Sequence, residues 1–534
     1  MFTEGAGLGR LGKLLILPAL EVTGLIDAAQ EVYERMRNGF YGLTSVILMM
    51  VFLALAREPR AQGATRLSPI DFGRLLGLDR MPEVKTIRRK LAELAKRHLG
   101  SALVSSLALR HAKAHPAQIG YLYVDGHVRV YAGSRDLQKA HVTRSRIAAP
   151  ATLETWVNDQ RGDPVFVVTS ELSASLVAEI RALLPELRRI VGDDRRVTIV
   201  FDRGGWSPGL FAEMLKQNFD FLTYRKGRVR KEPARAFSTQ VFVDHGIEHV
   251  YVLADRRVRL PLPKNFAPRK TLLARQVVRL NANGHQTQIV TSRYDPPAPE
   301  IAHRMFSRWR QENYFRYGRE HFCLDSLDSY ASKPDDPSRS VPNPARKVLQ
   351  AKLRRQRAVL AHAEASLGKA AQNAKPSHRS MKGFATANKD LTAAVEDARA
   401  KVESLSAKVA ATPGRVPVAS IRPEATVLDE ERKLVTHAIR MATYNAESAL
   451  ARMLIGEFPM DEARALLREA FNSPGDLEVT GSALYIRIDP LSAPRRTRAL
   501  AALCEKLTDA EITYPGTNLV LHYSVKDAPG ITST

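Results

Sequence analysis

RRVTIVFDRGGWS, residues 195–207, gives the clearest fold signal in the sequence. Its apolar run VTIVF predicts a buried strand that ends at Asp202. Two glycines follow and leave open backbone beside the carboxylate, and Ser207-Pro208 then begins a helix. The stretch therefore predicts a strand that presents a carboxylate at its carboxyl end.

The surrounding segments predict an α/β core. YLYVDGHVRVYAG, residues 121–133, predicts a strand carrying Asp125, a turn at Gly126 and a second strand. PVFVVTS (164–170) predicts a third strand, a helix runs through 172–191, and FDFLTYRKG (219–227) returns as a strand after the Ser-Pro helix. Hairpin, strand, helix, strand, helix, strand is the order of a ribonuclease-H-like fold, whose first and fourth strands are neighbours. We therefore expect Asp125 to lie beside Asp202.

The core is interrupted by a β-rich segment. Strand patterns recur within residues 228–298, and Asn281 to Gly284 predict the turn of the last hairpin. A third long helix is expected to begin near Pro299 and to contain Glu312. We predict an α/β core of residues 118–227 and 299–330 with residues 228–298 inserted as a β-domain.

Helical segments flank this core. Residues 1–115 are helical and basic, and residues 425–534 predict further helices and a small α/β unit. Behind the proline-rich linker SKPDDPSRSVPNP, residues 344–412 carry two apolar stripes at alternating steps of three and four. The break at Lys375-Pro376-Ser377 favours a helical hairpin with coiled-coil character, suited to a protruding arm or an oligomer contact. The fold class is therefore multidomain α/β.

Charge indicates the partner. The 534 residues include 80 Lys and Arg against 56 Asp and Glu, a net charge of +24, which suits a polyanion. Nucleic acid is favoured over a membrane surface, because no basic amphipathic membrane helix stands out and the apolar run Tyr41–Ala56 is too short for a span. Cys323 and Cys504 lack disulfide or zinc spacing. We expect a cytoplasmic protein, associated with the nucleoid in a bacterium.

Two basic segments are candidate DNA contacts. Ser68-Pro69 opens a short helix that ends at Gly77, and a strongly cationic helix follows from Val84, which suggests a helix-turn-helix. A solvated charged face is the alternative for this helix, as a solvated loop is for the second segment. The candidate residues of the two segments are Lys85, Arg88, Arg89 and Lys90, and Arg225, Lys226 and Arg228.

Each acidic residue also has an ordinary structural explanation. Arg308, Glu312 and Arg319 share one helix face, which suits a phosphodiester but is also compatible with an ordinary surface ion pair. Asp125 has the alternative of a turn aspartate before glycine. Asp255 also follows an apolar strand, but no open backbone or helix start comes after it, so Asp202 is preferred.

Three motifs together resemble a known family. VDGHVRVY, VFDRGGWS and RWRQENYF resemble the acidic motifs of DDE transposases of bacterial insertion sequences, in the group with a β-insertion and a Y-x2-R-x3-E-x6-K signature. Arg308, Glu312 and Arg319 match its spacing, whereas Met305 stands in place of the tyrosine and Arg319 in place of the lysine.

The resemblance implies a reaction class. Asp125, Asp202 and Glu312 would hold two Mg²⁺ ions, with Mn²⁺ able to substitute, for cleavage at the ends of the element and strand transfer into target DNA. Arg308 and Arg319 would bind phosphates at the ends. The resemblance also implies double-stranded DNA as partner and a homo-oligomer that holds two ends.

Alternatives remain at this point. A transposase-derived DNA-binding protein or regulator without catalysis would use the basic N-terminal region, and a coiled-coil scaffold would leave the strand-end aspartates unexplained. Trp206 and Trp309 adjoin the acidic motifs, where burial in the core is the default and stacking on an unpaired base is the alternative.

Overall fold

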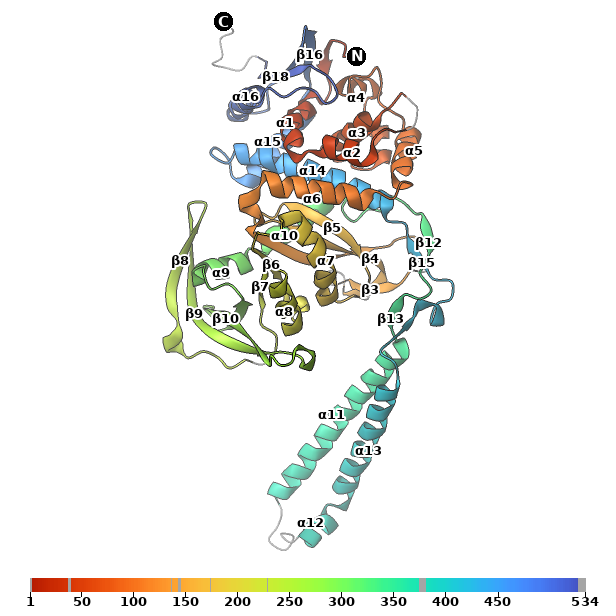
Figure 1. Cartoon of the computed structure of the whole chain (residues 1–534), viewed down its shortest axis with the longest axis vertical. Coiled ribbons are helices and arrows are strands. Elements are labelled where there is room, and N and C mark those ends of the chain that lie inside the picture. Colours follow the sequence, from red (N-terminus) through yellow and green to blue (C-terminus); the bar gives the residue numbers. More distant parts are fainter. Residues whose placement is uncertain are drawn as a thin grey trace. The chain divides into compact units, whose positions relative to one another are not determined.

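The structure, a computed structural model, describes residues 2–36, 40–135, 137–142, 146–172, 174–227, 229–373 and 381–526. The chain divides into two compact units. The first contains residues 1–133, 138–331 and 429–534, and the second contains residues 134–137 and 332–428. Figure 1 shows the elements of both.

A ten-stranded sheet forms the centre of the first unit. Its strand order is β3-β4-β2-β6-β7-β11-β10-β9-β8, with β5 paired to β4. The strands are β2 (Tyr121–Val130), β3 (Lys139–Val142), β4 (Ile147–Asn158), β5 (Pro164–Ser170), β6 (Val197–Phe201), β7 (Phe219–Tyr224), β8 (Ser238–Asp244), β9 (Ile247–Pro261), β10 (Thr271–Leu280) and β11 (Gln286–Thr291).

The register between β2 and β6 places the two aspartates. The strands pair in parallel, with Tyr121 opposite Thr198 and Tyr123 opposite Val200. Continuing this register by two residues brings Asp125 opposite Asp202, where the β6 ladder has ended. The predicted adjacency of the two strands is confirmed, although 76 residues separate the aspartates in the sequence.

The expected turn at Gly126 is wrong. β2 runs without interruption from Tyr121 to Val130, so Asp125 lies within a strand, opposite Trp156 of β4. The hairpin partner of β2 is β4, an antiparallel strand that the sequence patterns did not reveal. Glycine in a strand weakens it without ending it, and pairing with β4 and β6 overrides the local Asp-Gly turn signal.

The inserted segment extends the sheet and does not form a β-domain of its own. β11 pairs with β7 in antiparallel register, with Thr223 opposite Val290, and β10, β9 and β8 continue outward from it. Residues 228–298 therefore share backbone hydrogen bonds with the core. This differs from the predicted separate domain, because the last inserted strand returns to the open edge of β7.

Helices position the other site residues. α7 (Leu176–Val191) and α8 (Pro208–Lys216) begin at Ser175 and Ser207, whose hydroxyls accept the backbone N–H of Ala178 and Leu210. The single long helix expected from Pro299 is instead two helices. α9 (Ala298–Phe306) ends before Ser307, and α10 (Trp309–Phe322) begins after Arg308 and carries Glu312.

The two ends of the chain pack together. β1 (Gly5–Leu8) joins β16 (Gly475–Thr480), β17 (Ala483–Ile488) and β18 (Val520–Val525) in one sheet. α14 (Glu431–Met453) lies against α6 (Gly100–Ala114), as Figure 1 shows. The N-terminal helices and residues 429–534 thus belong to one compact unit, whereas residues 425–428 belong to the second.

The remaining helices of this unit complete that packing. They are α1 (Leu17–Thr23), α2 (Leu25–Tyr33), α3 (Leu43–Leu55), α4 (Pro69–Leu75), α5 (Val84–Ala95), α15 (Met460–Asn472) and α16 (Pro494–Thr508). α3 is the apolar run noted in the sequence, and it is buried, as expected. Within the described ranges, no helix is both long and apolar enough to cross a membrane.

The second unit is a helical hairpin on a short β base. α11 (Pro344–Gln372) and α13 (Lys389–Ala411) run side by side, with α12 (Met381–Ala387) between them in the chain (Figure 1). The expected linker forms two ladders, β12 (Ser332–Pro334) with β15 (Thr426–Leu428) and β13 (Ser340–Pro342) with β14 (Arg415–Pro417). The predicted break at Lys375-Pro376-Ser377 lies outside the described residues.

Candidate active site

Asp202 lies directly after β6 with its carboxylate folded over the glycine turn. The backbone N–H of Gly204 donates to Asp202 Oδ1 at 2.7 Å. A side chain on Gly205 would place its Cβ 2.3 Å from Cδ2 of Phe201, closer than atoms can approach. The two glycines therefore allow the chain to turn tightly beneath the buried ring and to present the aspartate at the surface.

Asp125 stands beside it on β2. Its side chain is 27% exposed, and Arg308 donates from Nη2 to Oδ2 at 3.1 Å. The backbone N–H of Gly126 donates to Oδ1 at 2.8 Å. Arg308 itself directly precedes α10, so the break between α9 and α10 brings this guanidinium to the aspartate.

The three predicted carboxylates share one electrostatic environment. Burial raises the pKa of Asp125, Arg308 opposes that shift, and the negative charges of Asp202 and Glu312 raise the pKa further. Glu312 lies in the first turn of α10, where the helix dipole favours a negative charge. The charges of Asp202 and Glu312 thus both act on Asp125, and Arg308 balances part of this negative charge.

The spacing of these oxygens is wider than that of a single-ion cage. Among the described residues, the group whose three candidate ligand atoms all lie within 4.8 Å of one another is Asp244, His249 and His303. Two ions about 4 Å apart require ligands spread around both of them. An all-oxygen donor set is the kind that Mg²⁺ prefers, so the three carboxylates fit this metal.

Two further residues belong to this neighbourhood and were missed from the sequence. The pKa of Tyr224, at the end of β7, is raised by burial and responds to the charges of Arg308, Arg203 and Glu312. The Arg203 guanidinium lies 5.7 Å from the centre of the Tyr224 ring. Arg203 directly follows Asp202 in the sequence, which is the signal that would have identified it.

A basic groove runs along α10. It encloses about 510 Å³ and includes Trp309, Asn313 and Glu320 of that helix. Its arginines are Arg161, Arg310, Arg316, Arg452, Arg464 and Arg468. Trp309 is 54% exposed, so the expectation that it packs in the core is wrong, whereas Trp206 packs edge-on against Phe211.

The predicted DNA contacts on α5 divide by exposure. Lys85, Arg88 and Arg89 are exposed, and Arg88 donates to Gln62 at 2.7 Å. Lys90 is only 4% exposed and lies 3.6 Å from Glu93, so it faces the protein and not a groove of DNA. Lys90 lies next to the apolar stripe of α5, so its aliphatic stem is buried together with the apolar side chains.

The other basic candidates also differ in accessibility. Lys226 is exposed, whereas Arg225 is partly buried and donates to the side chain of Gln276. Arg319 is partly buried in the last turn of α10. Arg228 lies outside the described residues.

The rival aspartate and the mismatched methionine both have structural roles. Asp255 lies inside β9, where Arg275 donates to its Oδ2 at 2.7 Å. Met305 is fully buried on α9, in an apolar cluster with Tyr123 and Val200. A thioether fills this packed position without needing a hydrogen-bond partner.

Comparison with known proteins gives the family. A family model described as transposase protein matches residues 4–527. The chain belongs to this transposase family. No curated protein matches the sequence significantly. The cryo-EM structure of a piggyBac transposase synaptic complex with hairpin DNA matches at 12% identity, over 60% of this chain and 71% of that one, with a TM-score of 0.31. As a transposase, the protein acts in DNA transposition, a form of recombination.

Proposed function

We propose that the protein is a DDE-type transposase that cleaves DNA at the ends of its element and joins them to target DNA. The observation that supports the proposal is the register of β2 and β6, which, when continued by two residues, sets Asp125 opposite Asp202. The charge of Glu312 also acts on Asp125. The order β5-β4-β2-β6-β7 supports a ribonuclease-H-like core around these residues. In this proposal Asp125, Asp202 and Glu312 hold two Mg²⁺ ions.

The chemistry follows from the charges at the site. Bound Mg²⁺ supplies activation of the attacking oxygen and neutralises charge on the phosphate. Arg308 balances Asp125 and offers the planar donor fork that suits a phosphate oxygen. Glu312 and Asp202 are accessible from solvent, as ligands facing a large substrate must be.

DNA is the proposed partner, and the groove along α10 is its proposed path. The groove lies on the helix that carries Glu312, and Arg161, Arg316 and Arg468 provide charge for backbone phosphates. The other three arginines, Arg310, Arg452 and Arg464, pair with acidic side chains of the protein. The exposed Trp309 at its edge is suited to stacking on an unpaired base. Lys85, Arg88 and Arg89 provide a second contact on α5. Two element ends must be held together, which favours a homo-oligomer.

The test compares Asp202→Asn with Asp194→Asn, an exposed turn residue that serves as matched control. We expect Mg²⁺-dependent nicking of element-end DNA to fall by at least about 100-fold in Asp202→Asn, because a metal ligand is lost. DNA binding should persist in both variants.

Undiminished cleavage by Asp202→Asn would contradict the catalytic assignment. If the unaltered protein binds end DNA but never cleaves it with Mg²⁺ or Mn²⁺, the alternative of an inactive transposase-derived regulator is correct.

A further inference from the structure

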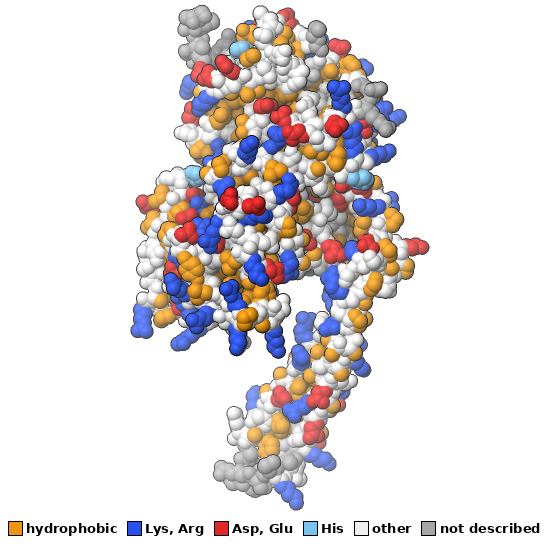
Figure 2. Space-filling model, in the orientation of Figure 1, with side chains coloured by type: hydrophobic (Ala, Val, Ile, Leu, Met, Phe, Trp, Pro, Cys, Tyr) orange, Lys and Arg blue, Asp and Glu red, His pale blue; other side chains and the backbone are white. Residues whose placement is uncertain are grey.

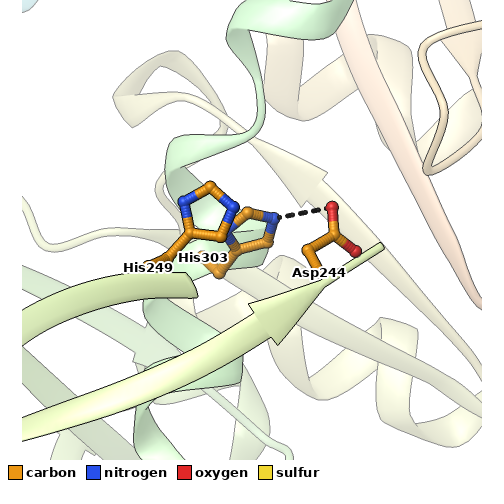
Figure 3. Close-up of side chains that lie close together, drawn as sticks. All are labelled: Asp244, His249 and His303. Atoms are coloured by element: carbon orange, nitrogen blue, oxygen red, sulfur yellow. Dashed lines mark hydrogen bonds and ion pairs between the residues drawn. The ribbon is translucent and has the colours of Figure 1, made fainter. Parts of the chain in front are cut away.

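Three metal-ligand side chains converge away from the carboxylates. Asp244 ends β8, His249 lies near the start of β9, and His303 is in the last turn of α9. Their candidate ligand atoms all lie within 4.8 Å of one another. Figure 3 shows the two imidazoles next to each other with the carboxylate facing them.

The hairpin geometry accounts for this convergence. Phe242 lies opposite His249 in the β8–β9 ladder, so Asp244, two residues further on, points to the same face. That face packs against α9, where the Phe242 and His303 rings are 5.0 Å apart. Three chain segments therefore direct their polar side chains to one point.

The surroundings hold His303 in an orientation suited to metal binding. Tyr251 Oη lies 3.2 Å from Nδ1 of His303, while Nε2 faces Asp244 Oδ2 at 3.2 Å. Ligands of a tetrahedral zinc ion are separated by about 3.3 Å, given metal–ligand bonds of about 2.0–2.1 Å. A partner on the second ring nitrogen is the usual arrangement for a metal-binding histidine.

A plain hydrogen bond between His303 and Asp244 is the simpler reading, but it leaves His249 unexplained. The His249 ring is 4.4 Å from that of His303 and only partly exposed, and the described residues provide no hydrogen bond to its side chain. Oδ2 of Asp244, the oxygen that faces His303, also receives a hydrogen bond from Arg310 Nη2 at 2.6 Å. Such a bond to a ligating carboxylate is typical of the outer shell of a metal site.

We propose that Asp244, His249 and His303 bind one Zn²⁺ ion through two imidazole nitrogens and one carboxylate oxygen. Two nitrogens and an oxygen suit Zn²⁺ and not Mg²⁺, which prefers oxygen alone. The site is therefore distinct in ligand chemistry from the three carboxylates of the proposed catalytic centre.

The bound ion would fasten the β8–β9 hairpin to α9. His303 is followed within five residues by Arg308, which contacts Asp125, and Arg310 links Asp244 to α10. The metal would thus fix the break between α9 and α10 that positions Arg308 and Glu312. The proposed role is to hold these elements together, and a water molecule would complete the tetrahedral coordination.

Metal binding to the untagged full-length protein tests the proposal. After chelator treatment the protein is titrated with Zn²⁺ in excess Mg²⁺, and bound metal is measured by mass spectrometry. We expect one Zn²⁺ per chain. His249→Asn should bind at least about tenfold more weakly, and Zn²⁺ should raise the unfolding temperature of the unaltered protein but not of this variant.

His285→Asn is the matched control, since His285 is exposed in the turn between β10 and β11, and it should bind Zn²⁺ like the unaltered protein. Asp202→Asn should also bind Zn²⁺ normally, which separates this site from the proposed catalytic one. His249 is partly exposed, so its replacement is compatible with folding, which circular dichroism verifies. Absence of stoichiometric Zn²⁺, or equal affinity of His249→Asn and His285→Asn, would overturn the proposal.

Discussion

At the scale of single residues, the carboxylates beside Arg308 place unfavourable charge at the surface of the core. Burial and the charges of Asp202 and Glu312 raise the pKa of Asp125. A carboxyl group whose pKa is higher in the folded than in the unfolded protein stabilises the folded state only while it is protonated. This stabilisation is lost as the pH rises through the folded pKa. At neutral pH Asp125 is ionised, and its charge lowers the free energy of unfolding by the full amount.

Asp202→Asn should therefore stabilise the protein when no divalent ion is present. The amide removes a charge that opposes ionised Asp125 and keeps an oxygen that can accept from Gly204. We expect a higher unfolding temperature in chelator, equivalent to about 1 kcal/mol, as is common when a strained functional site is neutralised. Calorimetry in chelator and in Mg²⁺ measures both effects.

Mg²⁺ should raise the unfolding temperature of the unaltered protein more than that of Asp202→Asn, since the ion binds the folded site. Asp194→Asn provides the control. A lower stability of Asp202→Asn in chelator would show that the carboxylates do not repel one another as inferred.

At the scale of elements, sequence patterns predicted the helices and strands whose local signals agree with their place in the folded protein. β6 and α8 follow from an apolar run and a Ser-Pro start, and both form as expected. β4 was missed because its first half, Ile147 to Ala151, contains Pro150 and a run of alanine that disfavour a strand. The position of β4 is determined by pairing with β2 on one side and β5 on the other, and a local sequence pattern does not reveal such pairing.

For the candidate site, the sequence supplies the residues, and their roles stay a prediction. Asp125, Asp202 and Glu312 each follow from a local pattern, and fold order predicts that the first two are neighbours. The Asp244–His249–His303 cluster was not predictable, because His303 reaches the hairpin only through the packing of α9 on β8 and β9. Lys90 was misassigned because charge alone does not show which way a side chain points.

α14 is an element whose burial has a consequence for pH. His437 Nε2 lies 2.9 Å from Oε1 of Glu154, which also pairs with Arg129 at 3.2 Å, all within the interior. Burial lowers the pKa of His437 to about 4, although Glu154 opposes that shift. An ordinary histidine in the unfolded chain has a pKa of about 6.5.

We therefore predict an acid-dependent loss of stability that His437 causes. His437 is protonated below about pH 6.5 in the unfolded chain but only below about pH 4 in the folded protein. The free energy of unfolding therefore falls by up to about 3 kcal/mol as the pH is lowered across this interval. Urea unfolding at several pH values measures the slope. His437→Gln should be less stable at pH 7 but should show a smaller slope, and an unchanged slope would assign the effect to other groups.

At the scale of the whole molecule, the chain closes on itself. β1 pairs with β16, so residues 5–8 contact residues 475–477 across nearly the full sequence. Seventeen residues of α14 are buried, among them Glu447, whose carboxylate receives Arg57 from the N-terminal region at 2.9 Å. The transposase family model likewise spans residues 4–527. Both observations indicate that the N- and C-terminal regions belong to one unit. The sequence alone suggested that these two regions were separate domains.

The helical hairpin of α11 and α13 has little buried surface. Few of its side chains are buried, namely Leu353, Val395 and Ala398 among the stripe positions. Val348 and Val359 on α11 are 54% and 53% exposed. They are eleven residues apart, which is about three turns, so they lie on one side of the helix. Lys352 and Arg355 are also exposed and lie on the same side between the two valines, so this side is a mixed apolar and basic surface. Figure 2 likewise shows basic side chains among the hydrophobic ones along the hairpin. The two exposed valines are candidates for contact with a second copy of the chain.

We predict that removing residues 344–412 abolishes pairing of two DNA ends and leaves each copy folded. Asn343 N–H donates to the carbonyl of Gly414 at 3.0 Å, so a short Gly-Ser turn can replace the hairpin without straining β13 and β14. Light scattering on complexes with element-end DNA should then give one chain per end, while Mg²⁺-dependent nicking of single ends persists. Val348→Ser combined with Val359→Ser should also weaken pairing. Val22→Ser on α1 is the control, since Val22 is 60% exposed. Paired-end complexes of unchanged mass after the deletion would show that the copies associate through the first unit instead.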